Sequence, residues 1–157
     1  RIGYITGDLL LNKLGLTNQI GTIVQIARNY FKPPIVRGAV KIRFVLQKNI
    51  IEDKSIQALE LLDSIKLINK IPGKTVADSY SSILQILSTL DKKCLKQMVA
   101  LSNNYNPATR AVFASMLFDI NQTQISYQIK KGLNPLTRFY SIHNNTIVQS
   151  ITDRGLL

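Results

Sequence analysis

The sequence predicts an α+β fold, with a small N-terminal β-sheet and a cluster of about five to six helices packed on one side of it. The first part of the chain contains β-branched segments and one alternating apolar–polar segment, whereas apolar residues recur at helical spacing after Asn49. Strands followed by a run of helices are typical of α+β domains. We therefore expect a single domain over residues 1–157, with a β-rich part at about 1–50, a helical part at about 51–135 and a candidate closing strand at 137–142.

The β-rich part begins with a short helical segment and a strand. Thr6 is suited to accept a hydrogen bond from a first-turn amide and Gly15 to form a left-handed stop, so we expect a helix of about two turns between them. β-Branched residues predict a strand over residues 22–28. Two prolines in residues 29–34 disfavour a continuing strand, so a loop or turn is expected there.

Residues 39–47 show a clear strand pattern. Successive side chains of a strand point to opposite faces, so the alternation predicts one apolar and one polar face. We expect a half-buried strand whose basic face points outward. The apolar set is Val40, Ile42 and Phe44, and the outward set is Lys41, Arg43 and Val45.

Five helices are predicted in the second part of the chain. The first ends before Pro72, because proline does not continue a helix. Asp91 is a suitable N-cap for the third helix, and Asn106 followed by Pro107 is a good start for the fourth. The fifth is short and is expected to stop at Gly132.

Positive charge is the strongest compositional signal. The chain carries 20 Lys and Arg against 9 Asp and Glu, which gives a formal net charge of +11. Such a surplus attracts polyanions, and counterion release makes nucleic acid the expected partner. The alternative is that the lysines merely keep the protein dispersed.

Neither a membrane-spanning helix nor an internal disulfide is expected. Apolar runs reach about four residues, against the roughly 20 of a membrane helix. Cys94 is the single cysteine, so an internal disulfide is excluded and a reducing, cytoplasmic setting is favoured.

No catalytic or metal-binding constellation is evident, so the protein is expected to be a non-enzyme without a cofactor. His143 is the single histidine and lies in a polar stretch. Cys94 is expected to be buried, because helical spacing places it on the side of Met98. Glu60 and Asp63 are expected on the polar side of an amphipathic helix, where carboxylates are solvated.

Two groups of basic residues are candidate binding surfaces for nucleic acid or a partner. The outward face of the strand at 39–47 is one, and the N-terminal half of the third helix is the other. Each has a structural explanation, since lysine on strands blocks edge pairing and lysine on exposed helix faces is ordinary. The residues are Arg37, Lys41 and Arg43 in the first group, with Arg37 as a candidate extension, and Lys92, Lys93 and Lys96 in the second.

Two segments resemble the C-terminal domain of AbiEi-type antitoxins. The stretch GYITGDLLLNKLGLTNQI, Gly3–Ile20, is similar to the start of that domain in its glycine–aromatic pair, its Thr–Gly pair and its LGLT.Q motif. The stretch YNPATRAVFASML, Tyr105–Leu117, is similar to a Pro-Ala-Thr-Arg-Ala helix start in the same group. Gly21 departs from the family pattern, which has a proline at that turn.

The resemblance implies an antitoxin and transcriptional regulator of a type IV toxin–antitoxin, or abortive infection, system. Its C-terminal domain would oppose a nucleotidyltransferase-like toxin as a functional rather than a stable physical partner, and would support autoregulation and self-association. A basic domain of this kind could compete for tRNA or hold DNA through its phosphates. The family's DNA-reading winged helix precedes this domain, and we expect it to be absent or removed upstream of Arg1. The alternatives are a protein-interaction or oligomerisation module of a bacterial regulator, or a nuclease-like enzyme, which would need clustered acidic residues.

Overall fold

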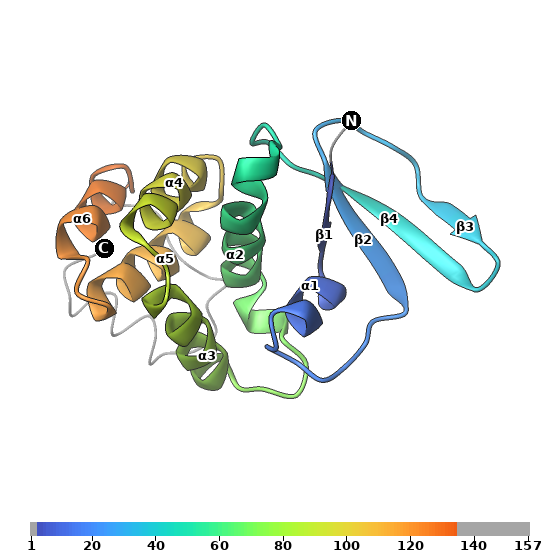
Figure 1. Cartoon of the computed structure of the whole chain (residues 1–157), viewed down its shortest axis with the longest axis horizontal. Coiled ribbons are helices and arrows are strands. Elements are labelled where there is room, and N and C mark those ends of the chain that lie inside the picture. Colours follow the sequence, from blue (N-terminus) through green and yellow to red (C-terminus); the bar gives the residue numbers. More distant parts are fainter. Residues whose placement is uncertain (1–2, 135–157) are drawn as a thin grey trace.

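A four-stranded mixed sheet forms one end of the molecule in the computed structural model, which describes residues 3–134 (Figure 1). The strand order is β1–β2–β4–β3. β1 pairs antiparallel with β2, β2 pairs parallel with β4, and β3 pairs antiparallel with β4. The strands are β1 (Tyr4–Thr6), β2 (Ile23–Arg28), β3 (Ile35–Arg37) and β4 (Val40–Leu46).

The parallel pair arises because β3 lies at the outer edge of the sheet. The chain leaves β2 through a loop that contains Pro33 and Pro34, neither of which donates a ladder hydrogen bond. It forms β3, turns at Gly38 with a φ of 57°, and returns as β4 between β2 and β3. That left-handed φ favours glycine at the turn.

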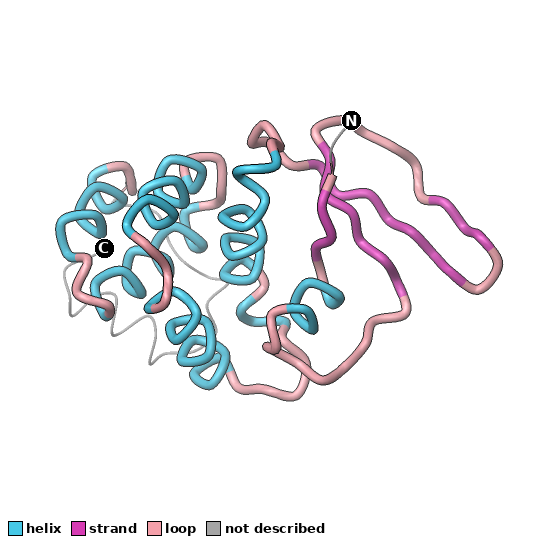
Figure 2. The backbone as a smooth tube through the Cα atoms, in the orientation of Figure 1, coloured by secondary structure: helices cyan, strands magenta, loops and turns pink. Residues whose placement is uncertain are grey.

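The described chain has six α-helices, of which α1 lies beside the sheet and α2 to α6 form the other part of the molecule (Figure 2). α2 lies between the sheet and the remaining C-terminal helices (Figure 1). Two short 3-10 turns, at Asp53–Ser55 and Ile68–Lys70, flank α2. The α-helices are α1 (Asp8–Lys13), α2 (Ile56–Lys66), α3 (Val76–Ser88), α4 (Lys92–Ser102), α5 (Pro107–Asp119) and α6 (Thr123–Lys131).

The predicted helix starts at Asp91 and Asn106 and the predicted stop at Gly15 are confirmed. The Asp91 carboxylate accepts a hydrogen bond from the Cys94 amide at 2.7 Å, and the Asn106 side chain accepts one from the Thr109 amide at 2.8 Å. These bonds satisfy amides that the first helical turn leaves without partners. Gly15 has a φ of 68° shortly after the end of α1, as a left-handed stop requires.

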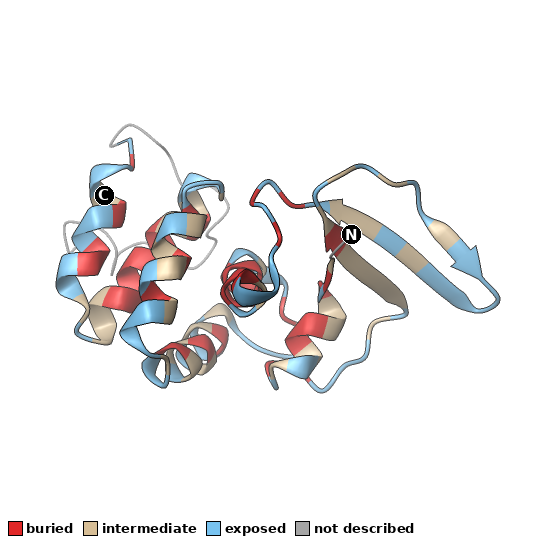
Figure 3. Ribbon diagram, turned by 45° about the horizontal axis from the view of Figure 1, so that its top comes forward, coloured by how far each residue is buried: buried red, intermediate tan, exposed pale blue. Residues whose placement is uncertain are grey.

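The main core lies among the helices, where buried residues concentrate (Figure 3). A second, smaller cluster joins the sheet to α2. It consists of Tyr4, Ala27, Ile51 and Leu59. Burial is therefore deep where β1 and β2 face α2, and it is shallow toward β3.

The structure confirms the α+β fold and the predicted order of sheet and helices. The sequence did not predict β1 and β3, because a strand of three residues is too short to show an alternating pattern. The candidate closing strand at 137–142 lies outside the described residues.

Candidate nucleic-acid interface

The sheet comes from a part of the chain without acidic residues. Between Asp8 and Glu52 the sequence contains seven basic side chains and no acidic one. Five of them are exposed, and the side chains of four of these five form no ion pair or hydrogen bond within the described part of the chain. The seven are Lys13, Arg28, Lys32, Arg37, Lys41, Arg43 and Lys48; Lys13 and the last four are exposed, and of these five Lys13 alone pairs with a described residue, Glu60.

Two of the other basic side chains, those of Arg28 and Lys32, lie against aromatic rings. The Arg28 guanidinium lies 5.2 Å from the centre of the Phe44 ring. The ammonium of Lys32, in the loop after β2, lies 5.0 Å from the same ring centre. Arg28 also donates a hydrogen bond to the Tyr30 hydroxyl. These contacts are cation–π interactions, which hold a charge at the surface without neutralising it.

The basic face of β4 is turned toward the helical side of the sheet. Arg43 is paired in register with Gln25 and Val45 with Ala27 on β2. Ala27 is paired in turn with Tyr4 of β1, whose side chain is directed toward α2. Since paired residues point to the same face, the basic residues of β4 lie on the face that carries the cleft described below.

The predicted inside and outside of β4 are therefore wrong, although the predicted alternation and the exposure of Lys41 and Arg43 are confirmed. The apolar set lies on the face turned away from α2, and Val40 is 47% exposed there. The physical reason is position in the sheet. α2 packs against β1, at the far edge from β3, so β4 has no deeply buried face.

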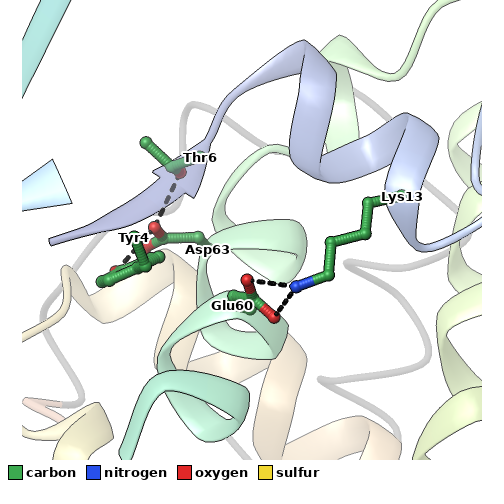
Figure 4. A network of polar contacts seen from close by, with 5 residues as sticks. All are labelled: Tyr4, Thr6, Lys13, Glu60 and Asp63. Atoms are coloured by element: carbon green, nitrogen blue, oxygen red, sulfur yellow. Dashed lines mark hydrogen bonds and ion pairs between the residues drawn. The ribbon is translucent and has the colours of Figure 1, made fainter. Parts of the chain in front are cut away.

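A carboxylate network joins the sheet to the helices at that face (Figure 4). Oδ2 of Asp63, in α2, accepts hydrogen bonds from the hydroxyls of Tyr4 at 2.9 Å and Thr6 at 2.8 Å. Oδ1 of Asp63 accepts one from the Tyr105 hydroxyl at 2.7 Å. Gln47 donates through Nε2 to both tyrosine hydroxyls, at 2.8 and 3.2 Å. Each buried polar group in this set has a partner, which is the condition for a stabilising network.

The network continues through side-chain amides to the segment before α5. The side-chain oxygen of Gln47, Oε1, accepts hydrogen bonds from the backbone amide and the side-chain amide of Asn49. Asn49 accepts a bond from Asn104 at 2.8 Å and donates one to the Leu101 carbonyl oxygen at 3.0 Å. The end of β4 is thereby fixed against the loop between α4 and α5.

Glu60 and Asp63 do not lie on a solvated helix face, so that prediction is wrong. Their exposed fractions are 7% and 6%. The Lys13 ammonium contacts both oxygens of Glu60, at 2.6 and 2.9 Å, and hydroxyls bind Asp63 (Figure 4). The structure buries every residue from Ala58 to Ile65, so the polar side of α2 faces other elements instead of solvent, which helical spacing alone does not reveal.

Burial changes the acidity of the two tyrosines. Desolvation, and then the negative charge of Asp63, raises the pKa of the Tyr4 and Tyr105 hydroxyls well above the ordinary value for tyrosine. Both hydroxyls are therefore neutral hydrogen-bond donors at physiological pH. Their role in this arrangement is to fix the carboxylate.

Thr6 belongs to this network, and its predicted role as a helix cap is wrong. Gly7 is the N-cap of α1, with a φ of 69° and no side-chain cap bond. A Cβ at Gly7 would lie 2.7 Å from the Gln25 side chain, so this close approach requires glycine. The Thr–Gly pair thus places a hydroxyl on Asp63 and lets Gln25 lie over the start of α1.

Between the sheet and the helices lies an open cleft of about 250 Å³. β2 and β4 form one wall, through residues that include Gln25 and Val45. The end of α2 and the start of α5 form the other, through residues that include Lys66 and Tyr105. Asp63 lies at the wall, and Lys48 follows β4 at the rim.

A second hollow of about 440 Å³ adjoins the cleft. The two share Lys66, Leu67 and Asn106 in their linings. Lys70 lines the second hollow and is exposed. A hollowed surface therefore runs from β4 across the end of α2, with basic side chains along it.

The second predicted basic group lies elsewhere. Lys92, Lys93 and Lys96 are exposed in the first half of α4, as expected. α2 lies between α4 and β4 in both ribbon views (Figures 1 and 3), so the two groups do not form one surface. Arg37 also departs from the expected line, because it is paired with Val40 and therefore lies on the opposite face of the sheet from Lys41.

A metal site and a reactive thiol have little support among the described residues. Within residues 3–134, no group of three or more His, Cys, Asp and Glu side chains is placed to hold a metal ion. Cys94 is half-buried, and burial followed by the charge of Asp91 raises the pKa of its thiol. His143 lies outside the described residues.

None of the described helices has the length and apolar character needed to cross a membrane. Comparison with known proteins adds no relative, since the chain significantly matches no family model, no curated protein and no solved structure. The resemblance to AbiEi-type antitoxins stays a prediction.

Proposed function

We propose that this chain is a non-enzymatic nucleic-acid-binding domain, the C-terminal domain of a type IV antitoxin acting in the cytoplasm. The observation that carries the nucleic-acid part is the set of exposed, unpaired cations on a sheet whose sequence contains no acidic residue. We call Lys41, Arg43, Lys48 and Lys66 the basic surface; all four lie on or beside the face that carries the cleft.

Electrostatics favour a polyanion at this surface. Several carboxylates elsewhere in the described chain are occupied: Glu60 binds Lys13, Asp63 binds hydroxyls, and Asp91 caps a helix. Within residues 3–134 the side chains of the basic surface have no such partners, so its lysines and arginine are available to phosphates. Each phosphate they neutralise releases counterions, which makes binding strong at low salt and weak at high salt.

The antitoxin part rests on the two segments that resemble the family. They lie about 100 residues apart in the sequence, yet Tyr4 and Thr6 from one and Tyr105 from the other donate to the same carboxylate. Residues that build one network are expected to occur together, which supports a fold shared with that family. Competition with a nucleotidyltransferase-like toxin for tRNA would then explain neutralisation without a stable toxin complex.

A protein-interaction module is the second candidate, and the other sheet face favours it. Ile5, Val40 and Leu46 are 43%, 47% and 61% exposed on the face turned away from α2. Exposed apolar side chains grouped on one face are typical of association sites. Self-association through that face leaves the basic surface on the other side accessible.

The test compares two charge reversals of equal size. K41E/R43E changes the basic surface, and K92E/K93E makes the same change in net charge on α4. We expect K41E/R43E to weaken binding of a fluorescent tRNA or DNA at least about tenfold at low salt and to flatten the salt dependence, because phosphate contacts are lost. Equal losses in both variants would mean that net charge alone attracts the nucleic acid.

Two further measurements separate the candidates. Binding of nucleic acid that falls steeply with added salt supports the basic surface, whereas an apolar interface hardly responds to salt. Co-expression with a nucleotidyltransferase-like toxin tests neutralisation: K41E/R43E should fail to restore growth and K92E/K93E should restore it. If both variants restore growth, the basic surface has no part in neutralisation.

A further inference from the structure

The cleft is built by segments from distant parts of the sequence. β1, β2, β4, the end of α2 and the segment before α5 line it, and the Asp63 network joins β1, the end of β4 and the segment before α5 to α2. Hydrogen bonds to buried groups therefore position these walls, including the loop between α4 and α5. A cleft with fixed walls loses little conformational entropy when it binds a ligand.

The charges of the cleft favour an anion. Asp63 is the one carboxylate in the lining, and hydroxyl donors occupy both of its oxygens. Lys48 and Lys66 also line the cleft, and within residues 3–134 neither has an ion-pair or hydrogen-bond partner. The C-terminal end of α2 and the N-terminal end of α5 both reach the cleft, so their opposite partial charges offset and the lysines decide the sign.

The remaining lining suits a flat group with hydrogen-bonding edges. Ala27, Val45 and Leu67 supply apolar surface, and Gln25 supplies a side-chain amide that forms no hydrogen bond among the described residues. At about 250 Å³ the cleft is slightly below the range of drug-sized pockets, so the ligand is small. A nucleotide combines these features, with an anionic phosphate and a flat base that carries donors and acceptors.

We propose that the cleft binds one unpaired nucleotide of a single-stranded nucleic acid, with its phosphate at Lys48 and Lys66 and its base against Val45, Leu67 and Gln25. This inference rests on the proposed nucleic-acid function and names the substrate class. A base inside a duplex is stacked and paired, so it does not enter a cleft, whereas an unpaired nucleotide in a loop or a 3′ end does.

The surface on either side of the cleft fits a strand that continues past it. Arg43 precedes Val45 on the same face of β4, and Lys70 lines the adjoining hollow beyond Lys66. These side chains are placed to contact the phosphates before and after the bound nucleotide. Single-strand binding sites commonly combine such a basic groove with a surface on which a base rests.

The first experiment compares K48Q/K66Q with K92Q/K96Q, which removes the same charge from exposed lysines of α4. Circular dichroism establishes that both variants are folded. Binding of a labelled single-stranded oligonucleotide is then measured by fluorescence anisotropy beside a duplex of the same sequence. We expect K48Q/K66Q to bind the single strand at least about tenfold more weakly and to lower the salt slope by about 1–2, and K92Q/K96Q to change affinity less than about threefold.

The second experiment probes the cleft directly. Amide and side-chain NMR signals are followed on addition of a 5′-mononucleotide, the matching nucleoside and inorganic phosphate. We expect the mononucleotide to shift the Gln25 side-chain signal and the backbone signals of Val45 and Leu67, with smaller shifts from phosphate and smaller still from the nucleoside. A cleft that takes phosphate alone would give equal shifts with phosphate and the mononucleotide, which would overturn the inference.

The failures of the two proposals differ. If no nucleic acid binds at any salt concentration, the proposed function is wrong. If nucleic acid binds, but single strand and duplex bind equally well and K48Q/K66Q behaves like K92Q/K96Q, the nucleic acid lies on the basic sheet without entering the cleft. That result would contradict the inference and leave the proposed function in place.

Discussion

The helical part and the β3–β4 hairpin differ in how they treat charge and burial. In the helical part, apolar side chains such as Leu62, Phe113 and Met116 are fully buried, and several carboxylates have a partner or cap a helix. In the hairpin, basic side chains are exposed without partners among the described residues, and Val36 and Val40 are exposed as well. The difference indicates that stability resides mainly in the helices and binding in the sheet.

The boundary between the two parts is the Asp63 network. It joins β1 and the end of β4 to α2 and to the segment before α5. A site at such a boundary takes its rigidity from the helices and its charge from the sheet. This division predicts that the two parts respond very differently to the same kind of substitution.

Removal of the carboxylate at the boundary should have the largest effect. D63A leaves three buried or half-buried hydroxyls without their acceptor. We expect the free energy of unfolding to fall by about 4 kcal/mol, because each orphaned buried donor costs roughly 1–3 kcal/mol. Urea denaturation followed by circular dichroism measures this loss.

The matched substitution in the sheet is R43A, at an exposed residue without a partner in the described chain. Its effect on the free energy of unfolding should stay within about 0.5 kcal/mol. Comparable losses in D63A and R43A would contradict the division into a stabilising network and a binding surface.

Truncation of one residue type in each part should give the next largest difference. Leu62 in α2 is fully buried, whereas Leu46 at the end of β4 is 61% exposed. L62A should lower the free energy of unfolding by about 3 kcal/mol through lost burial and the cavity it leaves, and L46A by less than about 1 kcal/mol. Similar values for both would show that a partner or a neighbouring copy buries Leu46 in solution.

Alkaline pH should lower the free energy of unfolding by a smaller amount, through the two tyrosines of the Asp63 network. The folded-state pKa values of Tyr4 and Tyr105 are raised, whereas an unfolded tyrosine titrates near pH 10. Above about pH 10 the unfolded chain therefore binds fewer protons than the folded chain, so the free energy of unfolding falls as pH rises. The stabilising contribution is fully present below pH 10.

The size of this pH effect can be measured with phenylalanine variants. Each tyrosine contributes a fall of up to about 1.4 kcal/mol per pH unit above pH 10. Y4F should lose one tyrosine's share of that slope, and Y127F, which changes a tyrosine exposed on α6, should keep the wild-type slope. Equal slopes in both variants would mean that Tyr4 does not titrate as a buried group.

Much of the fold was predictable because its signals are local. The caps at Asp91 and Asn106 and the stop at Gly15 depend on neighbours within a few residues, and each lies where the sequence predicts it. The strands at 23–28 and 40–46 were found for the same reason. β1 and β3 were not predicted, because their stability comes from pairing with those strands rather than from their own sequence.

The site was less predictable because it depends on distant contacts. Amphipathic spacing placed Asp63 in solvent, yet hydroxyls 57 and 59 residues earlier and 42 residues later hold it in the interior. The exposure of Lys41 and Arg43 was predicted, but the face they share with the cleft was not, because it depends on which strand packs against α2. Lys66 was not proposed as a site residue, since nothing local distinguishes it from other helical lysines.

The central claim is that the nucleic acid contacts the sheet and cleft rather than the whole cationic surface. Titration of the ¹⁵N-labelled chain with a single-stranded oligonucleotide tests it directly, residue by residue. The account predicts amide shifts concentrated in β4, at Lys48 and at Lys66, with α4 unchanged. Shifts as large at Lys92, Lys93 and Lys96, or shifts spread evenly over all exposed lysines, would contradict it.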